Sequence, residues 1–109
     1  MGEEKQIELK ISFFENEELI SSPHIILMES QKGQIEISQN ERLLRFDVFA
    51  KRINGKIKTD IEISEKIGDR ALRKIAHPIM LIENDKKGKM TISSSNEKNI
   101  EVHILPALL

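Results

Sequence analysis

A segment of this chain is repeated, and the repeat limits the folds that the sequence is able to form. SPHIILMESQKGQIEIS, residues 22–38, resembles HPIMLIENDKKGKMTIS, residues 77–93. In both copies a proline precedes an apolar run, and a lysine–glycine pair leads into an alternation that ends in Ile-Ser. Five of the 16 residues aligned from the two prolines are identical. A single four-strand unit cannot bury its apolar face alone, so two similar units are expected to pack against each other.

The segments around the copies alternate between apolar and polar residues, which is the period of a strand with one buried face. This alternation occupies residues 7–13, 42–53, 56–64 and 99–105. Asn54-Gly55 separates two of these segments and predicts a two-residue hairpin, because a type I′ turn needs a positive φ at both central residues.

Prolines and glycines mark the expected boundaries inside each copy. We expect Pro23 and Pro78 to begin strands, where the missing N–H does least harm. We expect Gly33 and Gly88 to form turns, since glycine adopts a positive φ without steric cost. The copies therefore predict a strand, a turn and a second strand in each half of the chain.

These patterns predict an all-β protein. Isoleucine occurs 18 times and alanine four times, and branching at Cβ favours strands over helices. The predicted fold is a β-sandwich or partly open barrel of about eight antiparallel strands, in a single domain over 1–109. Its internal duplication consists of two four-strand pseudo-repeats, about 5–54 and 55–106. Residues 65–76 fit either a short helix or an irregular strand, because Gly68 interrupts their helical spacing.

Composition excludes several functional classes. The net charge is −1, aromatic residues are 4% of the chain, and Trp and Tyr are absent, so a nucleic-acid partner is not expected. The absence of cysteine excludes disulfides and thiol chemistry. No apolar run approaches the length of about 20 residues that spans a bilayer. The opening MGEEKQ does not resemble a signal peptide, so we expect a periplasmic location only if a signal peptide was removed.

Catalytic, cofactor and metal sites are not expected. Two acidic pairs, Asp60 with Glu62 and Glu83 with Asp85, share a strand face, but the first pair is predicted to face solvent, where a carboxylate keeps ordinary acidity. The three histidines are not spaced as metal ligands on one strand or helix. We therefore predict a protein that is not an enzyme.

Charge and strand edges are the remaining functional features. Residues 1–18 hold six glutamates against two lysines, whereas 41–58 hold six basic residues against two acidic ones. Such asymmetry favours association with a charged partner or between copies. Edge strands recruit partner strands, so we expect a protein partner or self-association through them. The apolar tail 106–109 either docks on the body or binds a partner. The basic residues predicted to contact a partner are Arg45, Lys51, Arg52, Lys56 and Lys58.

The repeated motif resembles the strand–turn–strand module of bacterial secretins, in which a proline opens a strand that leads through a glycine turn into a short apolar strand. The matching positions are Pro23, Gly33, Ile35 and Ile37, and in the second copy Pro78, Gly88, Met90 and Ile92. No long membrane-inserting hairpins or gate segment follow, so the resemblance does not imply a pore. It implies a periplasmic β-module that binds other envelope components.

The function that these observations predict is a non-catalytic protein-interaction module of a bacterial envelope or secretion-type assembly. The alternative is a small ligand-binding or inhibitor-type β protein, which a deep apolar pocket with a few polar groups would support.

Overall fold

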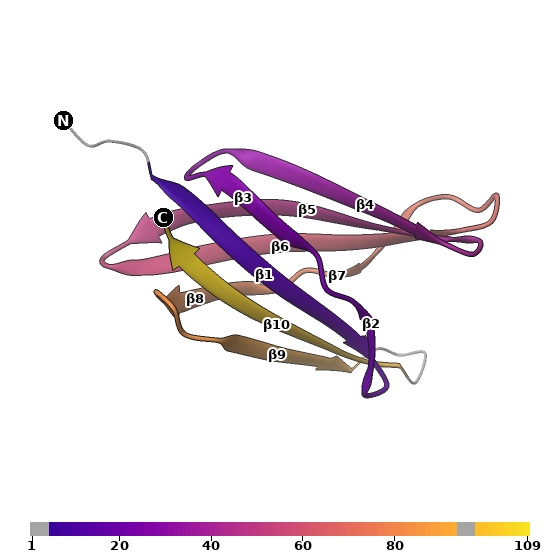
Figure 1. Ribbon diagram of the computed structural model, residues 1–109. Helices are drawn as coiled ribbons and strands as arrows, with labels where there is room; N and C mark the ends of the chain where they lie inside the picture. The colour runs from indigo at the N-terminus through magenta and orange to yellow at the C-terminus, as the bar shows by residue number, and fades with distance from the viewer. Residues whose placement is uncertain (1–4, 94–97) are drawn as a thin grey trace.

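Two antiparallel sheets pack face to face in this computed structural model, which describes residues 5–93 and 98–109 (Figure 1). Within these ranges all regular structure is strand, and no helix long and apolar enough to cross a membrane occurs there. The strands are β1 (Gln6–Glu15), β2 (Glu18–Ser21), β3 (His24–Met28), β4 (Lys32–Gln39), β5 (Arg42–Ile53), β6 (Lys56–Ile67), β7 (Arg73–Ala76), β8 (Ile79–Glu83), β9 (Gly88–Ser93) and β10 (Asn99–Leu108).

Each sheet has five strands. The first sheet contains β1, β2, β3, β9 and β10, with β1 and β10 at its centre, and the second contains β4 to β8, with β5 and β6 at its centre. The sheets do not close into a barrel. The prediction of an all-β sandwich is therefore confirmed.

The described strands number ten instead of the predicted eight, because a proline interrupts one edge of each sheet. β2 and β3 both pair with β1, and β7 and β8 both pair with β6. The interruptions lie at Pro23 and Pro78, whose carbonyls still accept hydrogen bonds from Ile11 N at 2.9 Å and Ile61 N at 3.1 Å. Each interrupted edge is thus one strand in two pieces.

The strand pairings of the second half repeat those of the first. In the first half β1 pairs with the interrupted edge β2–β3, and β4 crosses to the other sheet, where it pairs with β5. In the second half β6 pairs with the interrupted edge β7–β8, and β9 crosses to the other sheet, where it pairs with β10. The halves are joined by the β5–β6 hairpin and by the pairing of β1 with β10. Each sheet consequently contains strands from both halves.

The hairpin at Asn54-Gly55 forms as predicted, with φ of 49° and 80° at the two turn residues. Residues 65–76, for which helix and strand were both open, form strand, turn and strand. β6 continues to Ile67, and Gly68 then turns the chain with a φ of 56°. A left-handed residue at this position stops a helix from continuing through the segment.

Gly33 and Gly88 do not occupy turns, and the expectation that they would is wrong. The positive φ values lie at Ser30 (65°) and Asp85 (62°), three residues earlier in each half, whereas both glycines lie in strands. A Cβ on Gly33 would come within 2.7 Å of Ile25 Cδ1. A side chain at this position would therefore displace the end of the Ile25 side chain.

The core lies between the sheets and consists of the inward residues of the alternating strands. Phe13 and Phe46 meet at its centre with their ring centroids 6.0 Å apart in an edge-to-face arrangement. The tail 106–109 docks on the body, because β10 runs on to Leu108 and pairs with β1, placing Pro106 opposite Leu9.

Candidate interaction surface

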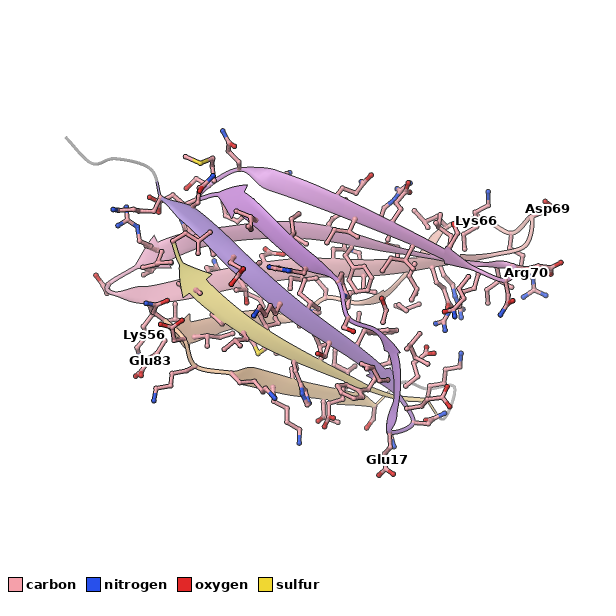
Figure 2. All side chains as sticks on the ribbon, in the orientation of Figure 1. Glu17, Lys56, Lys66, Asp69, Arg70 and Glu83 are labelled. Atoms are coloured by element: carbon pink, nitrogen blue, oxygen red, sulfur yellow. The ribbon has the colours of Figure 1, made fainter. Side chains whose placement is uncertain are left out.

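The five basic residues predicted to contact a partner do not form one patch. Arg45, Lys51 and Lys58 lie on the outer face of the second sheet, where Lys51 is directly opposite Lys58. Lys56 lies at the hairpin end of β6, close to Glu83 of β8 (Figure 2).

Two of the five basic residues form ion pairs. Arg45 binds Glu36 of β4 at 2.9 Å, and Arg52 binds Glu29 at 2.6 Å. The hydrogen bond from Arg52 lowers the pKa of Glu29 to about 2, which keeps this carboxylate charged at any physiological pH. Arg52 therefore fastens the turn between β3 and β4 to the end of β5.

Of the acidic pairs considered for catalysis, Asp60 and Glu62 line an open hollow of about 430 Å³ together with His77. Asp60 is 2.7 Å from His77, and Glu62 is 2.9 Å from Lys74. The hydrogen bond from Lys74 lowers the pKa of Glu62, whereas a general acid or base near neutral pH needs a raised pKa. Glu83 and Asp85 are exposed.

Each histidine meets a different carboxylate. His24 and His103 lie on the two strands that flank β1, whereas His77 precedes β8 of the other sheet. His24 is 2.8 Å from Glu8, and His103 is 3.0 Å from Glu101. Among residues 5–93 and 98–109, no three metal-ligating side chains come together.

An ion cluster formed by Glu15, Arg42, Glu65 and Arg73 was not identified from the sequence. Its two carboxylates are buried, whereas Arg73 is exposed. Arg42 donates to both oxygens of Glu15 at 2.7 Å and, from Nε, to Glu65 at 3.0 Å. Glu15 belongs to the first sheet and Glu65 to the second, so the guanidinium links the two sheets. The exposed fraction is 9% for Glu15 and 2% for Glu65.

Electrostatics keep Glu65 and Arg42 of this cluster ionised. Burial raises the pKa of Glu65, but hydrogen bonds from Arg73 and Arg42 outweigh it and leave the pKa below the usual value. The hydrogen bond to Glu15 raises the pKa of Arg42. A carboxylate held in this state is a structural ion and does not exchange protons near neutral pH.

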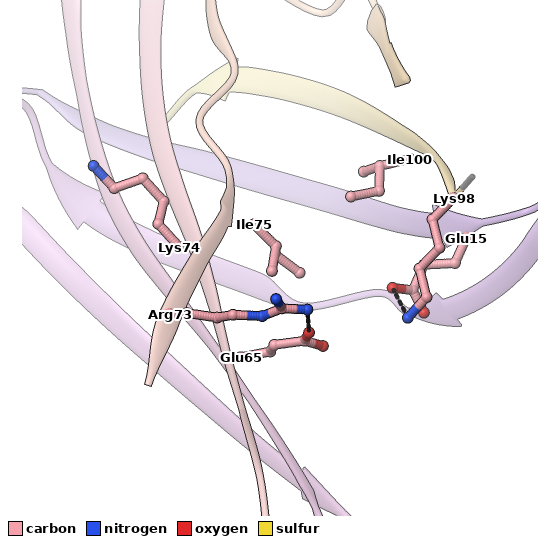
Figure 3. A pocket seen from close by; sticks show the side chains of 7 residues that line it. All are labelled: Glu15, Glu65, Arg73, Lys74, Ile75, Lys98 and Ile100. Atoms are coloured by element: carbon pink, nitrogen blue, oxygen red, sulfur yellow. Dashed lines mark hydrogen bonds and ion pairs between the residues drawn. The ribbon is translucent and has the colours of Figure 1, made fainter. Parts of the chain in front are cut away.

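A hollow of about 140 Å³ opens beside the cluster (Figure 3). Glu15, Glu65 and Arg73 line it, together with Lys98 and the apolar Ile75 and Ile100 at the rim. This volume is below the roughly 300–1,000 Å³ of ligand pockets, and its acidic groups are already held in ion pairs. Larger hollows of about 430 and 660 Å³ occur elsewhere among the described residues, and both are more open.

The open edges of the sheets offer a larger surface. β2 with β3 and β7 with β8 are each interrupted after four or five residues, whereas β4 is a continuous edge of eight residues and β9 one of six. β4 contains no proline, and its two charged side chains are Lys32 and Glu36. Proline is a usual protection of an edge, so β4 and β9 are the two edges without it among the described strands, and β4 is the longer of them.

The outward backbone groups of β4 belong to alternate residues. The two-residue turn at Asn54-Gly55 makes Ile53 and Lys56 a hydrogen-bonded pair, so the odd-numbered residues of β5 bond to β6 and the even-numbered ones bond to β4. The β4 residues opposite the latter are Gly33, Ile35, Ile37 and Gln39. The backbone N–H and C=O groups that point away from the sheet belong to Lys32, Gln34, Glu36 and Ser38.

Comparisons of this chain with protein-family models, with curated proteins and with solved structures gave no significant match.

Proposed function

We propose that this chain is a non-catalytic protein-interaction module that binds an extended partner segment along β4. The observation that carries the proposal is the continuous β4 edge, whose outward backbone groups have no partner among the described residues. Adding a strand to such an edge satisfies these groups, and the side chains of alternate residues give selectivity.

The two faces of β4 offer different contacts. Ile35 and Ile37 are half-buried and turn toward the core, and an added strand would cover them further. Gln34 and Glu36 stand on the outer face, where they bind Asp47 and Arg45 of β5. An apolar–polar alternation in the partner segment would complement both faces.

The setting that we propose is a bacterial envelope or secretion-type assembly, as the resemblance to the secretin module implies. In that setting the module would act in the periplasm, after removal of a signal peptide.

Site-specific photo-crosslinking tests the proposal. A photoreactive amino acid at Gln34 is expected to give covalent adducts with a partner chain in extracts of the cells that produce the protein. The matched control is the same group at Glu62, which also stands on the outer face of the second sheet but on the central strand β6.

A second variant blocks the edge itself. Gln34→Pro removes the backbone N–H of residue 34, which points away from the sheet. No hydrogen bond between β4 and β5 is lost, because this N–H does not face β5. It is expected to abolish the adducts of a crosslinker placed at Ser38 while circular dichroism stays unchanged. Equal adduct yields at Gln34 and Glu62, or none at either position, would overturn the proposed function.

A further inference from the structure

We infer that the partner strand at β4 is the β4 of a second copy of this chain, paired antiparallel about a two-fold axis at Gln34. This inference rests on the proposed function, because it uses the same edge and names its occupant.

The inference rests on the two charged residues of β4, Lys32 and Glu36, which are complementary to the same residues in a second copy. In an antiparallel pair of β4 strands, the outward residues of one copy become hydrogen-bonded partners of the outward residues of the other. With the axis at Gln34, Lys32 of each copy lies directly opposite Glu36 of the other, so the interface contains two Lys–Glu pairs around a central Gln–Gln pair. An isologous interface needs this kind of self-complementarity.

The neighbouring registers are less favourable. An axis between Gln34 and Glu36 sets Lys32 against Ser38 and makes no pair of opposite charges. An axis at Glu36 places the two carboxylates directly opposite each other, and like charges in that position are destabilising. Charge therefore selects the register centred on Gln34.

Both charges of the proposed pair are free to form it. Lys32 is exposed and has no carboxylate partner within residues 5–93 and 98–109. Arg45 uses only Oε2 of Glu36, at 2.9 Å from Nη2 and 3.0 Å from Nε, which leaves Oε1 to accept from a lysine. On the inner face, Ile35 of each copy lies opposite Gly33 of the other, where the missing side chain leaves room along the strand.

The second half of the chain lacks this complementarity. β9 occupies the place of β4 in the repeated pairing scheme, and Lys87 and Thr91 correspond to Lys32 and Glu36. Self-pairing of β9 about Lys89 would place two lysines together, which opposes it. Self-pairing is therefore expected at β4 but not at β9. With one self-pairing edge per copy, association stops at a dimer.

Analytical ultracentrifugation of the purified full chain over a range of concentrations tests the inference. The mass is expected to rise from 12.5 kDa toward twice that value as concentration increases. Lys32→Glu and Glu36→Lys each create two like-charge pairs and are expected to weaken the dimer at least about tenfold. The swap K32E/E36K restores opposite charges and is expected to return the dissociation constant to within about threefold of the original.

Matched controls come from the other half. Lys87→Glu, just before β9, and Thr91→Lys, within β9, introduce the same residue types at the equivalent positions and are expected to leave the dimer intact. Thermal unfolding of each variant verifies that the fold persists.

Two results would overturn the inference: a monomer at every concentration, or a dimer that Lys32→Glu and Glu36→Lys do not weaken. A monomer that still gives adducts with another protein at Gln34 would contradict self-pairing and leave the proposed function standing.

Discussion

Glu15 and Glu65 are two carboxylates whose ion pairs with Arg42 join the two sheets. Each is the last buried residue of its strand, two positions after Phe13 in β1 and Ile63 in β6. The alternation would place an apolar side chain at these positions, yet both are carboxylates that meet across the sandwich at Arg42. Two buried carboxylates without a shared cation would repel each other and lose hydration, so Arg42 is what makes their burial possible.

Replacing Arg42 is therefore expected to be costly. Arg42→Met leaves two buried carboxylates without their common partner, and the free energy of unfolding is expected to fall by about 3 kcal/mol. Chemical denaturation followed by circular dichroism measures it. Arg45→Met, on the outer face of the same strand, is the control and is expected to cost less than about 1 kcal/mol. Equal losses in the two variants would contradict the structural role of the cluster.

Stability is expected to fall in acid because several carboxylates are held below their ordinary pKa. Arg52 lowers the pKa of Glu29 from 4.5 to about 2, so its contribution is complete above pH 4.5 and is lost as the pH falls to about 2. The urea midpoint is expected to decline across this window, and less steeply in Glu29→Gln and in Arg52→Gln. Identical slopes in the original protein and both variants would show that the pair does not titrate in this way.

At the scale of elements, Gly33 and Gly88 of the repeated motif pack closely against other side chains within strands, whereas the sequence pattern placed them in turns. A Cβ on Gly88 would lie 2.5 Å from Ile82 Cδ1 and 2.9 Å from its Cγ1, with Met80 Sδ also within contact. On Gly33 the close contact is confined to the end of the Ile25 side chain, with the next atom at 3.9 Å. A terminal methyl rotates away more readily than a side chain enclosed on two sides.

The two glycines are therefore expected to respond differently to the same substitution. Gly88→Ala is expected to destabilise the protein by about 1–3 kcal/mol through overpacking, and Gly33→Ala by less. Neither position has a positive φ, so backbone strain does not contribute to the difference. Thermal denaturation of the two variants measures it, and a larger loss for Gly33→Ala would contradict the packing argument.

The alternation of apolar and polar residues also did not identify which strands lie at the edges of the sheets. Alternation reports which face of a strand is buried but not which neighbours pair with it. That β4 is an open edge and β5 a central strand follows from the crossing of the chain between sheets. The predicted contact residues Lys51 and Lys58 consequently lie on central strands, whereas the outward backbone groups belong to β4.

At the scale of the whole molecule, the first and last strands, β1 and β10, pair with each other and join the two halves of the chain. β1 and β10 run antiparallel from Ile7 opposite Leu108 to Glu15 opposite Ile100. The carbonyl of Pro106 accepts from Asp85 N at 2.9 Å, and Asn84 Oδ1 accepts from Leu108 N at 2.9 Å. The apolar tail thus belongs to the body of the sandwich.

Deleting residues 106–109 is expected to destabilise the whole fold. The deletion uncovers the inward side chains of Ile7 and Leu9 and removes the two hydrogen bonds to the turn at Asn84-Asp85. The free energy of unfolding is expected to fall by at least about 2 kcal/mol, as chemical denaturation would show. Deleting Leu109 alone is the control and is expected to cost less, since 55% of that residue is exposed. An unchanged stability after the longer deletion would mean that the tail does not support the core.

The sequence alone determined the strands, their inward and outward faces, the Asn54-Gly55 hairpin and the likeness of the two halves. These follow from period and turn chemistry, which act between residues close in the chain. Only the tertiary structure decided that each sheet combines strands from both halves, that Arg42 joins Glu15 to Glu65, and that β4 is left open at an edge. Arg42 is 27 positions from Glu15 and 23 from Glu65, and the paired residues of β1 and β10 are 85 to 101 positions apart. No local pattern specifies which distant residue will meet another.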